Sequence, residues 1–169
     1  ADEVLVTVGV SEGLDLAIRA LIEPGDEVLY HEPSYVSYNP LIQFAYGKPV
    51  AIQTKKENGF RLTRAELEEH VSPKTKLLLL NYPNNPTGAA LSKKDVEDIA
   101  AFAIEHDLIV LTDEIYDELT YERDHFSIIS VPGMKERTIY LHGFSKAWAM
   151  TGWRMGFTCA PPELTEAMM

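Results

Sequence analysis

The sequence predicts an α/β fold of three layers, in which helices cover both faces of a mostly parallel central sheet. Segments with the composition of strands alternate with segments of helical periodicity along the chain. The runs at 76–81 and 108–112 are apolar without polar alternation, which is typical of parallel strands that are covered on both faces. These two observations favour a doubly covered sheet over a sandwich or a helical bundle.

Composition limits the classes of protein that fit. The chain has 169 residues, 46% of them hydrophobic and 24% charged, which suits one soluble domain spanning 1–169. A net charge of −11 argues against nucleic acid and anionic membranes as partners. No apolar run is long enough to cross a bilayer. The single cysteine, Cys159, excludes an internal disulfide and fits a reducing compartment, so we expect a cytoplasmic protein.

Seven short stretches are rich in β-branched or aliphatic side chains and are predicted strands. In chain order they span 3–8, 27–31, 50–54, 76–81, 108–112, 137–142 and 155–160. Gly9 ends the first strand, and Asn58-Gly59 forms a turn after the third. Because the chain begins close to a strand and ends close to the start of a helix, we expect it to be a fragment.

Helices are predicted between these strands, where apolar residues recur at three- and four-residue spacing. In chain order they span 11–22, 36–46, 63–71 and 92–105, and a further helix starts at 161–163. Ser11 and Ser92 are expected to cap the helices that they begin. Thr63 and Glu66 have the spacing of a capping box, and Pro24-Gly25 ends the first helix.

The stretch 143–157 carries a lysine and an arginine whose chemistry is suggestive. Ser145-Lys146 follows an apolar strand, and a buried ammonium is costly unless it is paired or neutral. A neutral lysine amine can attack an aldehyde and form a Schiff base. Arg154 lies between glycines and can hold a phosphate through two parallel hydrogen bonds. An aldehyde and a phosphate together describe pyridoxal 5'-phosphate (PLP), although a surface lysine explains Ser-Lys alone equally well.

Other candidate residues follow the ends of other predicted strands. Val10 and Ser11 lie in a strand–turn–helix connection, which presents free backbone N–H groups to an anion. Tyr35 follows the second strand and is either a packing side chain or a platform for a flat ring. Asn85 lies in the constrained loop 82–88, and Asp113 follows the strand at 108–112, where a turn aspartate is the ordinary explanation.

The carboxyl ends of parallel strands meet at one edge of a sheet, where ligands of such folds bind. We therefore expect these segments to form one site.

These motifs, in this order, resemble the class I/II aminotransferases, the fold type I PLP enzymes of the aspartate and aromatic aminotransferase kind. The matching stretches are the Schiff-base lysine segment at 143–157, the loop Asn81-Tyr-Pro-Asn-Asn-Pro-Thr-Gly88, the Asp113-x-x-Tyr116 spacing and Glu32-Pro-Ser-Tyr35. The resemblance covers essentially the whole chain. It implies that 1–169 is the large, cofactor-binding domain of a longer enzyme, without its N-terminal arm and C-terminal small domain.

The resemblance also implies a role for each residue. Lys146 would form the Schiff base and carry the substrate proton, and Asp113 would meet the pyridine nitrogen. Tyr116 and Asn85 would bond the phenolic oxygen. Tyr35 would cover the ring. The phosphate would be held by Val10, Ser11, Ser145 and Arg154. Some members carry a serine or threonine two residues before Ser145, where this chain has Gly143.

The implied reaction transfers an amino group between an amino acid and a 2-oxo acid, in a homodimer when the protein is full length. Three alternatives stay open: a C–S lyase or ACC-synthase-like reaction on the same fold, a PLP-binding regulatory module, and a nucleotide-binding α/β domain. The last lacks support, because the chain has neither G-x-G-x-x-G nor a Walker A sequence. We also expect cis peptides at Glu32-Pro33 and Asn85-Pro86, since the matching prolines of related enzymes are often cis.

Overall fold

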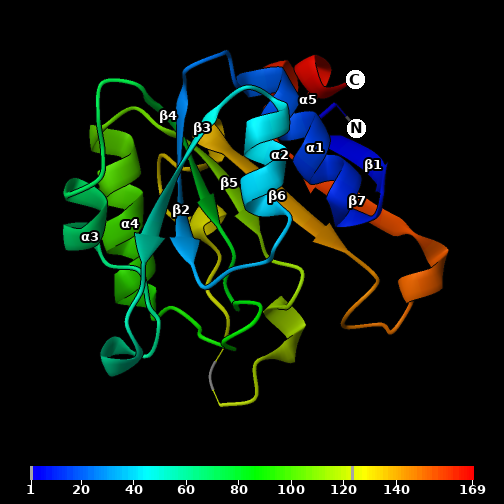
Figure 1. The fold of residues 1–169 in the computed structure, drawn as a ribbon. Coiled ribbons are helices and arrows are strands. Elements are labelled where there is room, and N and C mark those ends of the chain that lie inside the picture. Colours follow the sequence, from blue (N-terminus) through cyan, green and yellow to red (C-terminus); the bar gives the residue numbers. More distant parts are fainter. Residues whose placement is uncertain (1, 123) are drawn as a thin grey trace.

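The computed structural model describes residues 2–122 and 124–169 (Figure 1). Each predicted strand and helix is present, with bounds that differ by a few residues. The strands are β1 (Val4–Val8), β2 (Glu27–Glu32), β3 (Lys48–Gln53), β4 (Thr75–Leu80), β5 (Ile109–Asp113), β6 (Thr138–Gly143) and β7 (Met155–Cys159). The helices are α1 (Gly9–Leu21), α2 (Tyr38–Phe44), α3 (Arg64–Glu68), α4 (Lys93–Glu105) and α5 (Pro162–Met168).

The seven strands form one sheet in the order β1-β7-β6-β5-β4-β2-β3. Strands β2 to β6 pair in parallel, whereas β7 is antiparallel to both β6 and β1. Because β1 and β6 are both antiparallel to β7, β1 runs in the same direction as β6. The carboxyl end of β1 therefore lies at the same edge of the sheet as that of β6. The prediction of a mostly parallel sheet is confirmed, and β7 is its antiparallel member.

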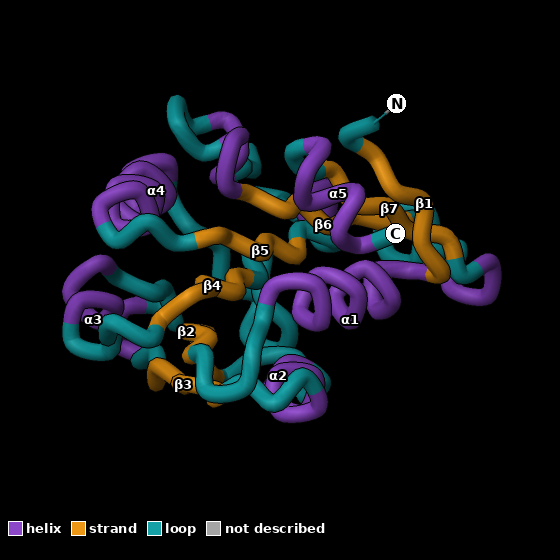
Figure 2. The backbone as a smooth tube through the Cα atoms, turned by 90° about the horizontal axis from the view of Figure 1, so that it is seen from above, coloured by secondary structure: helices purple, strands orange, loops and turns teal. Residues whose placement is uncertain are grey.

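Helices cover both faces of the sheet (Figure 2). Buried apolar side chains of α1, α2 and α5 belong to one hydrophobic cluster, and those of α3 and α4 belong to the other. Alternate leucines of β4 enter opposite clusters: Leu77 and Leu79 join the first, and Leu78 and Leu80 join the second. Each such leucine stabilises the fold by about 1.5–3 kcal/mol through burial. The absence of polar alternation in this strand therefore correctly predicted cover on both faces.

The starts of the helices test the capping predictions. Ser92 caps α4 and Thr63 caps α3 within a capping box, as expected, and Ser92 forms a second capping box with Asp95. Helix α1 instead begins at Gly9, so Ser11 lies inside its first turn and the predicted cap at Ser11 is wrong. Gly9 has a φ of +70°, a value that glycine adopts easily, and the chain therefore turns from strand to helix without an intervening loop.

Two further expectations concern loops. Glu32-Pro33 and Asn85-Pro86 are cis, as predicted, and Tyr82-Pro83 is also cis. The loop after β5 also turns a histidine inward: the side chain of His125 is only 20% exposed and its Nε2 lies 2.5 Å from Oε2 of Glu114. A carboxylate buried behind the loop attracts this ring inward.

No helix in the described part of the chain could span a membrane.

Candidate active site

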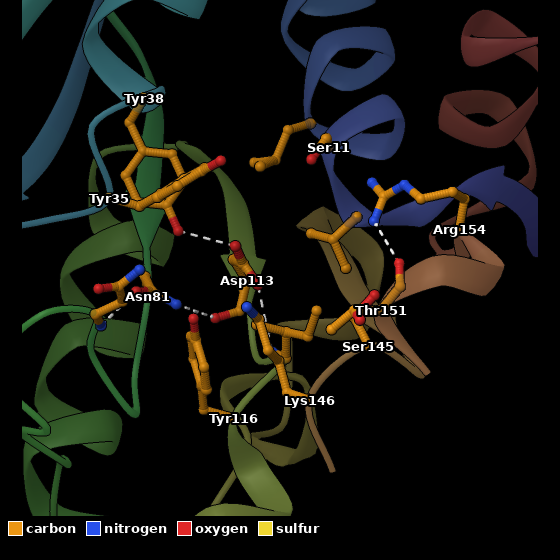
Figure 3. Close-up of a pocket in the computed structure, with 14 residues that line it drawn as sticks. Ser11, Tyr35, Tyr38, Asn81, Asp113, Tyr116, Ser145, Lys146, Thr151 and Arg154 are labelled. Carbon is orange, nitrogen blue, oxygen red and sulfur yellow. Dashed lines mark hydrogen bonds between the residues drawn. The ribbon is translucent and has the colours of Figure 1, made fainter. Parts of the chain in front are cut away.

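A pocket of about 280 Å³ opens at the carboxyl edge of the sheet (Figure 3). Its lining includes all nine residues that the sequence singled out: Val10, Ser11, Tyr35, Asn85, Asp113, Tyr116, Ser145, Lys146 and Arg154. They come from segments that follow β1, β2, β4, β5 and β6. The structure thus brings these segments together as predicted, while the chemical roles of the residues stay predictions. The pocket is also lined by Leu14, Tyr38, Asn81, Ile115 and Thr151.

Asp113 forms one end of the pocket. It is the last residue of β5 and is 4% exposed. Burial raises the pKa of its carboxyl from 3.8 to about 6, although a hydrogen bond from Tyr38 works against this rise. The Tyr38 hydroxyl donates to Oδ2 at 2.8 Å, and the Ile115 N–H donates to Oδ1 at 3.3 Å. Among the described residues, none forms an ion pair with Asp113, although the charge of His142 also works against the rise of its pKa.

Tyr38 is one of the lining residues that the sequence did not single out. It lies in the first turn of α2 and is 1% exposed. Its ring meets that of Tyr35 edge to face, with centroids 5.6 Å apart and an interplanar angle of 81°. Tyr35 itself is half-buried and borders the pocket. The pair therefore forms an aromatic wall beside Asp113 (Figure 3).

Asn81 is a second lining residue outside the prediction, and it connects two strand ends. Its Nδ2 donates to the carbonyl oxygen of Asp113 at 2.9 Å, and its Oδ1 accepts from the N–H of Asn85 at 3.0 Å. The side chain is 1% exposed. Asn81 thus orients the loop that carries Asn85 and holds it against β5. A polar residue at the end of the apolar run at 76–80 is the signal that could have revealed it.

Lys146 lies between the two ends of the pocket. It follows β6 by three residues and is exposed, so its ammonium does not bear the cost of burial. Its Nζ lies 5.6 Å from the centroid of the Tyr116 ring, and Figure 3 shows its side chain pointing toward Asp113. An exposed amine that faces a buried carboxylate and a tyrosine is accessible to a ligand in the pocket.

The other end of the pocket is cationic. Arg154 has a φ of 51° and its Nη1 donates to the Thr151 carbonyl oxygen at 3.3 Å. A Cβ built on Gly9 would lie 2.7 Å from Nη2 of Arg154, so the guanidinium lies directly against the start of α1. Ser11, in the first turn of that helix, and Ser145 add hydroxyl groups. A guanidinium beside a helix N-terminus is a favourable environment for an anion.

Comparison with known proteins agrees with this geometry. The family model for aminotransferases of class I and II matches residues 1–169. The chain belongs to this family. Members of the family depend on pyridoxal phosphate.

Two curated relatives in the aminotransferase family are archaeal. The aspartate aminotransferase of Pyrococcus abyssi is 49% identical over 168 residues, which are 99% of this chain and 43% of that protein. The aromatic-amino-acid aminotransferase 2 of Thermococcus litoralis is 48% identical, again over 99% of this chain and 43% of that protein. The crystal structure of the aromatic aminotransferase from Pyrococcus horikoshii OT3 superposes with a TM-score of 0.96 at 48% identity, covering 98% of this chain and 44% of that one. The chain thus spans less than half the length of these relatives.

The departure from the aminotransferase pattern at Gly143 has a steric cause. A Cβ at this position would lie 2.9 Å from the Met155 carbonyl oxygen and 3.2 Å from Cα of Gly156. Both belong to the backbone of β7, which pairs with β6, so a side chain at Gly143 would require that backbone to shift. Ser145 and Ser11 are the serines that line the pocket.

Proposed function

We propose that the protein to which this chain belongs transfers an amino group between an amino acid and a 2-oxo acid with PLP as cofactor. Residues 1–169 would form its large, cofactor-binding domain. One observation carries the proposal: a single pocket has a buried carboxylate at one end, an arginine at a helix N-terminus at the other, and a lysine between them.

The donor set of the pocket fits PLP group by group. Asp113 suits a protonated pyridine nitrogen, because an opposite charge offsets the cost of burying the carboxylate. Arg154, Ser11, Ser145 and the first-turn N–H groups of α1 around Val10 suit a phosphate. Lys146 is the amine that lines the pocket between these two ends. The fit therefore concerns three different chemical groups of the same molecule.

Bound PLP would supply an electron sink for a substrate carbon that has lost a proton. Asp113 would keep the ring nitrogen protonated, and Tyr35 would cover the ring. Asn85 and Tyr116 carry the hydrogen-bond donors for the phenolic oxygen. Nζ of Lys146 would take the proton from the substrate Cα and return it, so this amine must be neutral when it acts as a base.

The substrates, compartment and assembly are part of the same proposal. Amino acids and 2-oxo acids are the substrate classes, and the names of the relatives favour transfer over a lyase reaction. We place the full-length protein in the cytoplasm as a homodimer. Exposed apolar side chains around α2 support association: Val36 is 82% exposed, Phe44 65% and Tyr46 76%. A monomer by light scattering at high concentration would contradict the dimer.

Adding PLP to the full-length protein tests the proposal directly. A visible absorption band should appear with the intact protein and be lost with Lys146→Ala. Lys94→Ala is the matched control, because that lysine lies on the far helix α4 and its side chain is 80% exposed. An assay for the 2-oxo acid product, run beside assays for ammonia and pyruvate, separates transfer from elimination. A band that survives Lys146→Ala would refute the lysine assignment.

A further inference from the structure

The turn at residues 113–117 divides its side chains between two sides. Asp113 and Tyr116 line the pocket, together with Ile115. Glu114 and Asp117 do not line it, and each contacts a histidine instead. The turn thus carries two candidate active-site residues that face the pocket. It also carries two carboxylates, Glu114 and Asp117, whose partners lie outside the pocket.

Glu114 is the more buried of these two carboxylates, with an exposed fraction of 2%. Its Oε1 accepts hydrogen bonds from Thr112 Oγ1 at 3.0 Å and from Ser127 Oγ at 2.8 Å. Its Oε2 lies 2.5 Å from Nε2 of His125. Burial alone would lower the pKa of His125, but the hydrogen bond and charge of Glu114 raise it above 6.5. The side chain therefore ties the turn to the loop at 125–127.

Asp117 makes the second contact, with β6 rather than with a loop. Its Oδ1 lies 2.7 Å from Nε2 of His142, which is 4% exposed, and the Tyr140 hydroxyl donates to Oδ2 at 3.4 Å. The Asp117 N–H donates to the Glu114 carbonyl oxygen at 3.0 Å. The end of the turn is thereby joined both to its own beginning and to the strand that precedes Lys146.

We propose that Glu114 and Asp117 are positioning residues, which through His125 and His142 hold the turn at 113–117 so that Asp113 and Tyr116 face the pocket. This inference rests on the proposed function. A turn held at one point can still rotate about it, whereas contacts to a loop and to a strand fix its orientation. Active-site side chains need such support, because displacements of about 1 Å weaken them substantially.

Burial of charge supports a role beyond general stability. A buried carboxylate costs folding free energy unless its partners compensate, and apolar residues of similar size often serve stability as well. The pairs Glu114–His125 and Asp117–His142 nevertheless both involve carboxylates of the turn that carries Asp113 and Tyr116. The described part of the chain also offers a comparison pair: Glu68 of α3 lies 3.0 Å from His106 at the end of α4, and neither residue lines the pocket. It has the same Glu–His contact without the proposed task, at a more exposed position where Arg64 also pairs with Glu68.

The test uses the full-length protein loaded with PLP and three substitutions: Glu114→Gln, Asp117→Asn and, as the control, Glu68→Gln. Glutamine and asparagine keep a hydrogen-bonding group of the same size, so neutral histidines can still pair with them. We measure kcat, the pH midpoint of the cofactor's visible band, and the thermal unfolding midpoint.

Both variants of the turn should lower kcat about tenfold, as removal of supporting residues does in metal sites. They should also shift the pH midpoint of the band, because the surroundings of Lys146 change when Tyr116 moves. The control should match the unsubstituted protein in both quantities. A kcat and a pH midpoint that equal those of the control in both variants would overturn the inference, whatever the change in thermal stability.

A second variant keeps the test decisive if Glu114→Gln does not fold. His125→Asn removes the partner of Glu114 from the more exposed side of the pair, and it should give the same loss of kcat and the same shift of the band. An unchanged kcat and band in a folded His125→Asn protein would overturn the role of that pair. Failure of the proposed function is distinguishable, because the unsubstituted protein would then show no band, or would show the band without forming the 2-oxo acid product.

Discussion

The two ends of the pocket are built in different ways. At the Asp113 end, the carboxylate is buried and its backbone and side chain are held by Tyr38, Asn81 and Ile115. At the other end, Arg154 is exposed and its guanidinium donates a hydrogen bond to a carbonyl oxygen three residues away. The first end is fixed by neighbouring parallel strands, whereas the second forms where residues 9–11 meet residues 151–154.

This difference shows which end depends on a ligand. The Asp113 end already has its hydrogen bonds and has no ion pair among the described residues. The Arg154 end has a cationic side chain and helix N–H groups, and one bound anion would accept hydrogen bonds from both. We therefore expect substitutions at the first end to affect chemistry, and substitutions at the second to affect cofactor affinity.

The largest effect is expected from Asp113→Asn. Asparagine can still accept the Tyr38 hydrogen bond, so the pocket should keep its shape and still bind PLP. The loss of the charge should reduce kcat of the full-length enzyme by about a thousandfold or more, since the ring nitrogen then loses its opposite charge. Steady-state kinetics beside a PLP titration separates the two quantities. Near-normal turnover would show that Asp113 does not face the ring nitrogen.

Arg154→Gln should weaken PLP binding and change kcat much less once the enzyme is saturated. Hydrogen bonds to a charged group contribute about 1.5–3 kcal/mol, which corresponds to a Kd that rises roughly ten- to a hundredfold. Fluorescence titration of the cofactor-free protein measures this Kd. An unchanged Kd would remove Arg154 from the anion site and leave the helix terminus as its main component.

Gly9→Ala should act on the same end through the backbone. Alanine at a φ of +70° is strained by about 1–2 kcal/mol, and its Cβ would lie 2.7 Å from Nη2 of Arg154. The guanidinium must then move, and we expect the Kd for PLP to rise roughly five- to tenfold. Gly59→Ala is the matched control, since Gly59 has a similar φ of +69° and no atom within 4 Å of its added Cβ. Equal Kd values in both variants would contradict the expected effect.

Tyr38→Phe should have the smallest effect, and it sharpens the description of the buried end. The Tyr38 hydrogen bond favours the charged carboxylate, so its removal should raise the pKa of Asp113 further above about 6. The folded pKa already exceeds the ordinary 3.8, so Asp113 contributes stability that grows as the pH falls from about 6 toward 4, whereas His31, whose pKa burial lowers to about 4, removes stability over the same range. Carboxyl NMR titration of the cofactor-free protein measures this pKa, and a lower value in the variant would contradict the assignment.

The sequence predicted the residues of the pocket better than the contacts behind them. Lys146, Asp113 and Asn85 each stand next to the end of an apolar strand, so a local pattern located them. Tyr38 has no such signal, because its direction depends on how α2 packs on the sheet. The contact between Glu114 and His125 joins a strand end to a loop, and a pattern read along the chain does not reveal which polar side chains meet across space.

The fold was predictable for similar reasons, with one instructive exception. Periodicity and caps located the helices, and uninterrupted apolar runs located the central strands. The direction of β7 was not readable, since the composition of a strand does not tell whether its neighbours are parallel. The error at Ser11 has a related cause: a serine near a helix start favours a cap, but the φ of Gly9 decides where the helix begins.

The position of β1 at the end of the sheet affects how the protein is made. Among the described residues, its neighbouring strand is β7, which leaves the ribosome roughly 150 residues later. At about 5–20 residues per second, β1 waits roughly 8–30 seconds for that neighbour. During this time its backbone N–H and C=O groups are open to other chains, with Val4, Val6 and Val8 beside them. Until β7 arrives, the nascent chain therefore carries a strand with which other chains can pair.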